Sequence, residues 1–325
     1  MSKGHPGLPK ASKLILKKSD LLIDLQLIDA DKNAIKRVLT MENNFRTRVS
    51  RHVASLPSEN ASFQKFSTSP FVLMIQSLHQ NYSCISQIER DILPAKQFSS
   101  METSAGRMVE GVTLPTYGWE PVLSTMHTAN SAIDGKCLDG NTLKLATLKS
   151  GPRCLNDEMS ENFADAILTH ANQWAIEAGV QHIDFTYGVL YGTEKQSNKK
   201  DWHILRNLKD KLPSEMMTLP PDHRWQCEFT KDHVKIAVSI KIGLHWWNHL
   251  GGDTCFVELC IALIRACVSP GEGDPAHYSY AISDLGKIVS TSVVSSQFNV
   301  SILQRSQLAW LFLLARHFCD EIQDD

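Results

Sequence analysis

The sequence predicts an α/β fold. Between residues 131 and 268, short apolar runs with strand spacing alternate with longer segments of helical spacing, which is typical of a sheet flanked by helices. Helical spacing also dominates the first hundred residues and the C-terminal part of the chain. Apolar residues make up 42% of the 325 residues, enough to build a large core.

The first hundred residues are expected to form an N-terminal helical lobe, residues 1–100. From Lys13 to about Gln97 the apolar residues recur at helical spacing, as in Leu21, Leu22, Leu25, Leu27 and Ile28 and again in Phe71, Leu73, Ile75 and Leu78. The polar and small segment from Gln97 to Ser104 then predicts a boundary, after which the character of the sequence changes.

Strands and helices are expected to alternate in the central region, residues 101–270. A helix is predicted around Gly106 to Gly111, and strands near 131–137, 142–148, 182–191 and 234–242. A helix is predicted at 158–178, ended by Gly179, and another at 253–267. This order of elements predicts one sheet with crossover helices.

The remaining segment, residues 271–325, is expected to be mainly helical. It follows the turn from Ser269 to Pro275, the strongest breaker in the chain. The apolar run from Leu308 to Phe318 is interrupted by charge and is interpreted as a buried or dimer-interface helix. No run approaches the roughly 20 apolar residues of a membrane span, and the basic start is followed by no apolar signal region. We therefore expect a cytoplasmic protein without a membrane role.

The formal net charge of −2 gives no overall attraction for nucleic acid. A polyanionic partner would have to meet a local basic patch. The eight cysteines show no paired CxxC spacing, so we expect free thiols and neither a disulfide framework nor a structural zinc site.

The stretch from Ala132 to Asn156 carries the most chemical information. A hairpin turn at Asp139-Gly140 would bring Asp134 close to Lys149, and Thr147 would share the face of Lys149 on the second strand. A carboxylate is a natural ligand for Mg²⁺, and a lysine can orient or activate an attacking water, as phosphodiester hydrolysis requires. A purely structural hairpin explains the same pattern equally well.

Six short motifs occur in order along the central region. They are Thr103-x-x-Gly106-x-x-x-Glu110, Ile133-Asp134, Leu148-Lys149-Ser150-Gly151, Tyr187-Gly188-Val189-Leu190-Tyr191-Gly192, Ile204-Leu205-Arg206 and Ile242-Gly243-x-x-Trp246-Trp247-x-x-Leu250. In this order and spacing the chain resembles type II restriction endonucleases of the PD-(D/E)XK superfamily, those that cut interrupted palindromes of G and C. The resemblance covers roughly residues 101–268.

The resemblance implies a PD-(D/E)XK restriction-endonuclease-like mixed sheet flanked by helices, with 101–270 as the catalytic core. It also implies a homodimer and hydrolysis of double-stranded DNA that leaves 5′-phosphates. Asp134 takes the place of the metal-binding aspartate and Lys149 that of the catalytic lysine. Thr147 departs from the family pattern, which has Glu or Asp two residues before the lysine, so one metal ligand is missing.

Other groups are candidates for the missing ligand. Some members of the superfamily take it from the following helix, where Glu161 is the first choice and Glu158 the second. Glu110 and the backbone carbonyl of Leu148 are further candidates. Each acid also has an ordinary explanation, because acids are favoured in the first turn of a helix by its dipole and are common on solvated helix faces.

DNA contacts are expected from two basic segments. Residues 194–209 follow a strand and are rich in basic side chains, which favour phosphate contact. Arg153 lies in the turn directly after Lys149. The candidates are Arg153, Lys195, Asn198, Lys199, Lys200 and Arg206, although a solvated loop would have the same composition. Trp246 and Trp247 are expected to be core residues and not base-stacking platforms.

The sequence thus leads to the hypothesis of a Mg²⁺-dependent, site-specific endonuclease acting as a homodimer on double-stranded DNA. Two alternatives stay open. A repair or phage nuclease of the same fold would share the site but cut with less sequence preference. A DNA-binding protein with a decayed site would not cut at all, and Thr147 in the acidic position motivates that alternative.

Overall fold

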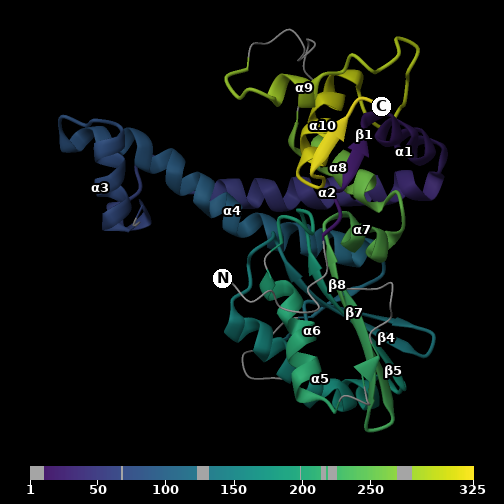
Figure 1. Cartoon of the computed structure of the whole chain (residues 1–325). Helices are drawn as coiled ribbons and strands as arrows, with labels where there is room; N and C mark the ends of the chain where they lie inside the picture. The colour runs from purple at the N-terminus through teal and green to yellow at the C-terminus, as the bar shows by residue number, and fades with distance from the viewer. Residues whose placement is uncertain are drawn as a thin grey trace.

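The fold is described from a computed structural model of the chain. It covers residues 11–66, 69–122, 132–197, 199–213, 217–218, 225–268 and 280–325. Helices and strands both contribute to a mixed α/β architecture, in which a sheet is flanked by helices and a pair of long helices projects from the body (Figure 1).

Seven strands form the main sheet in the order β2-β3-β4-β5-β8-β7-β6. They are β2 Glu120–Pro121, β3 Gly135–Asp139, β4 Thr142–Lys149, β5 His182–Val189, β6 Met217–Thr218, β7 Gln226–Lys231 and β8 Val234–Ile242. The central strands β4, β5 and β8 are parallel, and the outer strands on both sides pair antiparallel. The carboxyl ends of the three central strands therefore meet at one edge of the sheet.

The helices have the following bounds. They are α1 Lys18–Ala30, α2 Lys32–Ser55, α3 Pro70–His79, α4 Ile88–Thr116, α5 Asp157–Ala178, α6 Lys199–Lys211, α7 Leu244–Gly251, α8 Cys255–Cys267, α9 Leu285–Val289 and α10 Leu308–Arg316. Short 3-10 turns are formed at η1 Phe63–Phe66, η2 Ile85–Gln87 and η5 Arg305–Gln307. Strands β1 Ile15–Lys17 and β9 Glu321–Gln323 pair with each other in parallel, which joins the two ends of the described chain.

The hairpin between β3 and β4 is present as predicted, but its two-residue loop is Gly140-Asn141, one residue beyond the predicted Asp139-Gly140. Asp139 pairs with Thr142, and Gly140 takes a positive φ of 58°. A glycine with positive φ at the first loop position is typical of hairpin turns that match the twist of the strands. This hairpin sets the register that brings Asp134 opposite the end of β4.

Helices α5 and α6 cover one face of the sheet. Alternating residues of β5 point to this side, including Ile183, Phe185 and Tyr187, and pack with apolar residues of both helices in one core cluster. The side chain of Asn156 accepts a hydrogen bond from the N–H of Met159 (2.7 Å) and so caps α5, which ends at Gly179 with a φ of 68°.

A second core cluster lies beyond the other face of the sheet. It joins α1, α2, α7, α8 and α10 with Ala146 and Leu148 of β4. Helices α1 and α2, from the predicted N-terminal lobe, pack into the same cluster as α8 and α10. Helix α4 also runs without a break through residues 97–104, so the predicted boundary falls inside a continuous helix.

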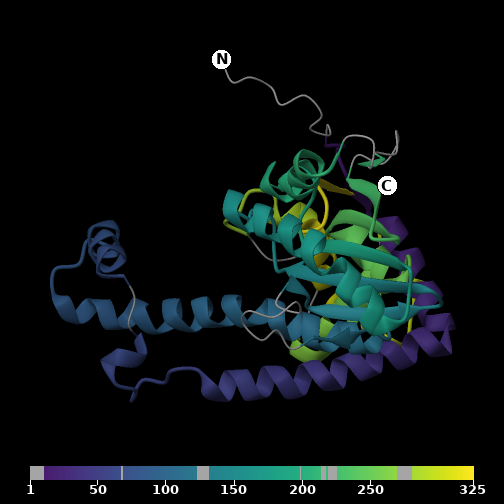
Figure 2. The same ribbon diagram turned by 90° about the horizontal axis from the view of Figure 1, so that it is seen from below.

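The distal halves of α2 and α4 form an arm that projects from the body and carries α3 at its far end (Figures 1 and 2). All buried residues of α2 lie between Ala34 and Phe45, and those of α4 lie between Gly106 and Leu114. The remaining turns of both helices contain no buried residue among those described. Together with α3 they make up what we call the arm, residues 46–105.

The predicted strands and the helices at 158–178 and 253–267 are present, with end shifts of a few residues. The helix predicted around Gly106 to Gly111 is part of the much longer α4. Trp246 and Trp247 are fully buried, as predicted. The basic segment after β5 contains the helix α6 and is not simply a loop. In the described part of 271–325, helix α10 buries its apolar side in this chain's own core. Across the described ranges, no helix has both the length and the apolar character needed to cross a membrane.

The turn from β8 into α7 depends on Gly243, which gives a stability prediction. Gly243 has a φ of 55°, and a Cβ at this position would lie 2.2 Å from the carbonyl oxygen of Gly192. We expect Gly243→Ala to lower the free energy of unfolding by roughly 3 kcal/mol or more, since backbone strain and a clash act together. Urea unfolding followed by circular dichroism measures the change.

The matched control is Gly179→Ala. Gly179 has a similar φ of 68° but open space around its Cβ position, so only the conformational cost of about 1 kcal/mol applies. Equal losses in the two variants would contradict the role assigned to the contact between Gly243 and Gly192.

Candidate active site

Helix α4 lies directly against the end of strand β4. Gly106 is buried, and a Cβ there would lie 2.7 Å from the Cβ of Ser150. Eight residues later, a δ-methyl of Leu114 lies 3.0 Å from the Cβ position of Gly135 in β3. Residues at i, i+4 and i+8 share one helix face. Glu110, midway between these two contacts, is therefore directed to the region where β3 begins and β4 ends.

Asp134 directly precedes β3 and is held against β4 by two hydrogen bonds. Its N–H donates to the carbonyl of Ala146 (2.8 Å), and its Oδ2 accepts from the N–H of Leu148 (2.7 Å). A carboxylate can accept several hydrogen bonds, so this contact orients the group without using all of its capacity. The N–H and C=O of one strand residue point to the same side, so the carbonyl of Leu148 also faces the side of Asp134.

Lys149 is the last residue of β4 and is half-buried. Its Nζ lies 5.7 Å from the ring centroid of Phe163 on α5, at a distance where a cation is attracted to an aromatic face. The ring of Phe163 packs in turn against Tyr187 of β5, with the centroids 5.9 Å apart. Residues of α5 and β5 thus support the ammonium group at the carboxyl edge of the sheet.

The charges of Asp134 and Lys149 both act on the carboxyl group of Glu110. The pKa of Glu110 is raised from 4.5 to about 7. Burial is the largest cause and the negative charge of Asp134 acts in the same direction, while Lys149 and Arg107 lower the pKa. Charge interactions weaken with distance, so this coupling reflects proximity. Glu110, Asp134 and Lys149 come from three separate elements and meet at one place.

Thr147 does not take part in this cluster in the way the sequence predicts. Its side chain is buried, and its hydroxyl donates a hydrogen bond to the carbonyl of Ala132. That contact ties the residues before β3 to β4 and so helps to position Asp134. Thr147 is therefore a structural support, and its hydroxyl does not converge with Asp134 and Lys149.

The structure does not bring Glu161 or Glu158 to the cluster. Glu161 is exposed and pairs with Nζ of Lys211 (3.1 Å), and Glu158 is also exposed. The residue of α5 that faces Lys149 is Phe163. Residues two apart in a helix point about 200° away from each other, which explains why Glu161 faces solvent.

The donor set fits one hard cation. Among the described residues, no group of three or more His, Cys, Asp or Glu side chains could hold a metal ion. Mg²⁺, however, is usually held by one or two carboxylates and keeps several waters. Two carboxylates whose repulsion raises one pKa, with a backbone carbonyl beside them, match that requirement. Glu110, Asp134 and the carbonyl oxygen of Leu148 would hold the ion.

Two of the predicted DNA contacts lie at the same edge of the sheet. Arg153 is exposed, takes a positive φ of 68° and donates from Nε to the carbonyl of Gln196 (3.0 Å). The loops after β4 and β5 are thereby joined. Lys195 is exposed in the second loop, one residue before Gln196. Both side chains are near the carboxyl end of β4, where a phosphate backbone would pass Lys149.

The other predicted contacts belong to α6 and the residue before it. Lys200 forms an ion pair with Asp157, and Arg206 is half-buried with its Nε in the interior. Neither is a solvated phosphate contact. Asn198 and the side chain of Lys199 lie outside the described residues.

Two arginines near the cluster were not identified from the sequence. The charge of Arg107, one turn before Glu110, reaches that carboxyl group. Arg48 of α2 donates from Nη2 to the carbonyl of Gly111 (3.1 Å). The spacing of three between Arg107 and Glu110 is a local signal for a shared helix face. No sequence signal places Arg48 beside Gly111, because that contact arises only from the packing of α2 on α4.

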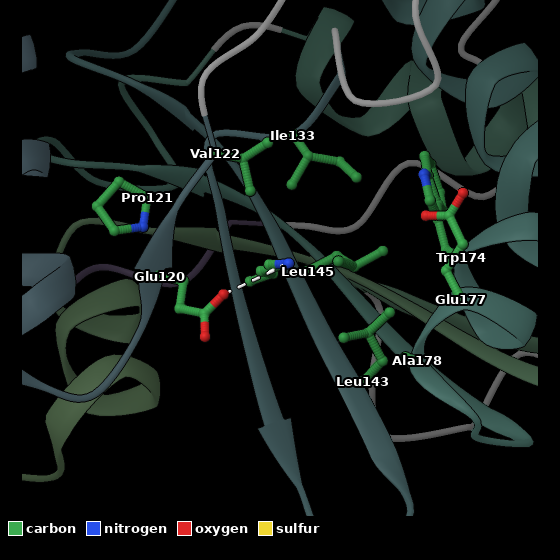
Figure 3. Close-up of a pocket in the computed structure, with 10 residues that line it drawn as sticks. Glu120, Pro121, Val122, Ile133, Leu143, Leu145, Trp174, Glu177 and Ala178 are labelled. Atoms are coloured by element: carbon green, nitrogen blue, oxygen red, sulfur yellow. Dashed lines mark ion pairs between the residues drawn. The ribbon is translucent and has the colours of Figure 1, made fainter.

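A separate cavity of about 400 Å³ lies near the opposite end of β4. Figure 3 shows apolar side chains of Val122, Ile133 and Leu145 on one side and Trp174 on the other, with the ion pair of Glu120 and Lys136 at the rim. None of the clustered groups lines this cavity. It is therefore distinct from the candidate active site.

Comparisons with known proteins do not assign the chain to a family. No protein-family model matches it, and no curated protein matches it. The functional argument therefore depends on the geometry and chemistry of the residues themselves.

The raised pKa of Glu110 predicts a pH-dependent stability. An acid whose pKa is higher in the folded state does not reduce the free energy of unfolding below pH 4.5, where it is protonated in both states. It lowers the free energy of unfolding as the pH rises from 4.5 through about 7. We expect Glu110→Gln to be more stable than the parent chain at pH 8, by up to roughly 3 kcal/mol, and nearly equal at pH 4.5. Urea unfolding at both pH values measures the difference.

Glu102→Gln is the matched control, because Glu102 is an exposed acid on the same helix. Its effect should be small at both pH values. A Glu110→Gln variant that gained no stability at pH 8 would refute the burial of a charged carboxylate at this position.

The close contact between Gly106 and Ser150 gives a second prediction. We expect Gly106→Ala to push α4 away from β4 and to lower the stability by about 1–3 kcal/mol. Adding Ser150→Gly removes the opposing Cβ and should restore most of the loss, which a double-mutant cycle in urea measures. Purely additive effects of the two substitutions would disprove the contact.

Proposed function

We propose that this chain is a Mg²⁺-dependent endonuclease that hydrolyses double-stranded DNA at a short palindromic site and leaves 5′-phosphates. The observation that carries the proposal is the convergence of Glu110, Asp134 and Lys149 from three elements. Two carboxylates and an ammonium group at one sheet edge are the groups that phosphodiester hydrolysis requires.

The two carboxylates bind the cation in this proposal, with the carbonyl of Leu148 as a third donor. Mg²⁺ supplies charge for the scissile phosphate and lowers the pKa of a bound water. Glu110 loses its proton when it binds a cation, since its pKa is close to neutral. Metal affinity should therefore increase from pH 6 to pH 8 as this carboxyl group ionises.

Lys149 acts on the reacting phosphate separately from the cation. Its ammonium donates hydrogen bonds to an attacking water or to a phosphate oxygen and offsets the negative charge that develops there. The ring of Phe163 keeps the side chain at the sheet edge. A pre-positioned cation of this kind needs no rearrangement during the reaction.

The surrounding cations fit a nucleic-acid backbone. Arg153 and Lys195 lie in the loops after β4 and β5, and Arg107 and Arg48 lie near Glu110 on the arm side. Basic side chains flank the cluster on both sides, as phosphate contacts would require. A palindromic substrate is two-fold symmetric, so two identical subunits would place one active site on each strand.

One observation favours a second function. Thr147 stands where the resembling enzymes carry an acid, and its hydroxyl is bonded to the backbone. The cluster then has one carboxylate fewer than usual on this strand. A protein that binds DNA without cutting it would be consistent with that loss.

The test is incubation of the purified chain with unmethylated phage DNA in the presence of Mg²⁺ or of EDTA. We expect discrete fragments only with Mg²⁺. Lys149→Ala should lower the cleavage rate by about a thousandfold or more, because a charge that acts on the reacting phosphate is lost.

Lys144→Ala is the matched control. Lys144 lies on the same strand and pairs with Asp139 in the hairpin (2.7 Å), so its loss should leave the cleavage rate unchanged. Fragments without discrete sizes would point to a nuclease of low specificity. DNA that is bound but intact with every divalent cation would refute the nuclease and support the binding protein.

A further inference from the structure

The end of the arm exposes an unusual amount of apolar surface. Helix α3 has no buried residue, and four of its side chains are about 70% exposed or more, namely Phe71, Met74, Ile75 and Leu78. Ile85 and Phe98, also on the arm, are 89% and 69% exposed. Contiguous apolar surface of this kind on a soluble domain is a mark of a binding site.

The four side chains of α3 form one stripe. They follow the spacing i, i+3, i+4 and i+7, which places them on a single side of the helix. The other side faces α4, where Val72, Leu73 and Gln76 line a hollow of about 200 Å³ together with residues of α4. We call Phe71, Met74, Ile75 and Leu78 the α3 stripe.

Two hydrogen bonds to one carboxylate of α4 tie α3 and the turn after it to the arm. The side chain of Gln76 donates to Asp91 of α4 (3.2 Å), and the hydroxyl of Tyr82 donates to the same carboxylate. A helix of ten residues is marginal by itself in water. Additional packing on the α3 stripe would supply the contacts that this helix lacks within its own chain.

The charge of the arm end identifies the partner. Helix α3 contains no Asp, Glu, Lys or Arg, and residues 57–100 contain three acids (Glu59, Glu89, Asp91) and three bases (Lys65, Arg90, Lys96). An anionic membrane or a nucleic acid would find no net positive charge there. A second identical surface, by contrast, meets no like-charge repulsion and can match the stripe residue for residue.

We propose that the α3 stripe is the dimer contact of this protein, formed with the α3 stripe of a second copy around a two-fold axis. A standard interface removes roughly 800 Å² from each partner, and the four mostly exposed side chains of the stripe supply a large part of that area. Helix α3 lies at the far end of the arm (Figure 2), whereas Glu110 belongs to the C-terminal turns of α4 that pack in the body.

This inference deepens the proposed function, because it names the surface through which two active sites would be paired. Its test does not depend on that function, since association is measured without DNA or metal. Sedimentation velocity of the full chain over a range of micromolar concentrations should show a reversible dimer.

Leu78→Glu should raise the dimer dissociation constant about a hundredfold or more, because two glutamates would then face each other across the axis. Leu78 is 84% exposed, so the substitution should not affect the fold, which far-ultraviolet circular dichroism checks. Met74→Glu provides an independent variant of the same stripe. Ile176→Glu is the matched control, since Ile176 is 70% exposed on α5, and it should leave the dimer intact.

A parent chain that stays monomeric at all concentrations would overturn the proposal. So would a dimer that survives both stripe substitutions, because its interface would then lie elsewhere. Binding of the monomer to phosphatidylserine vesicles, lost in Leu78→Glu, would assign the stripe to a membrane surface instead. A dimer that depends on the stripe but cuts no DNA would uphold this inference and refute the nuclease.

Discussion

The packing of α4 across the open ends of β3 and β4 is the constraint on which the candidate site depends. Gly106 lets the helix approach Ser150, and Leu114 fills the space over Gly135 one turn beyond Glu110. The helix is thereby held at two points, and the carboxyl group between them is partly removed from water. Without this approach Glu110 would be an ordinary solvated acid, and Asp134 would have no second carboxylate beside it.

The same helix connects the site with the arm. Its C-terminal turns lie in the core, and its N-terminal turns extend from the body toward α3. Glu110 and the arm end therefore belong to one continuous helix, which carries Pro94 between them. If two copies join at the α3 stripe, α4 also determines where the two candidate sites stand relative to the dimer axis.

The arrangement of Glu110 and Asp134 that favours cation binding lowers the stability of the fold. A half-buried carboxyl group with a pKa of about 7 destabilises the fold at the pH where it would bind a cation. Repulsion between Glu110 and Asp134 adds to that cost. Groups that destabilise a fold and are nevertheless brought together by its packing are characteristic of functional sites. This is the physical ground on which the cluster is preferred over the cavity near Trp174, where the charges of Glu120 and Lys136 are paired with each other.

The sequence by itself determined the local features of this protein. Hairpin geometry at Asp139-Gly140 and strand spacing were enough to place Asp134 near Lys149, and helical spacing identified α5 and α8. Only the tertiary structure decided which acid joins them. Glu161 was expected because some of the enzymes that the chain resembles take this carboxylate from the following helix, but the rotation of α5 turns Phe163 and not Glu161 toward Lys149. Which acid joins Asp134 and Lys149 depends on helix orientation and on long-range packing, which no local pattern encodes. The projection of the arm could not be predicted from the sequence for the same reason.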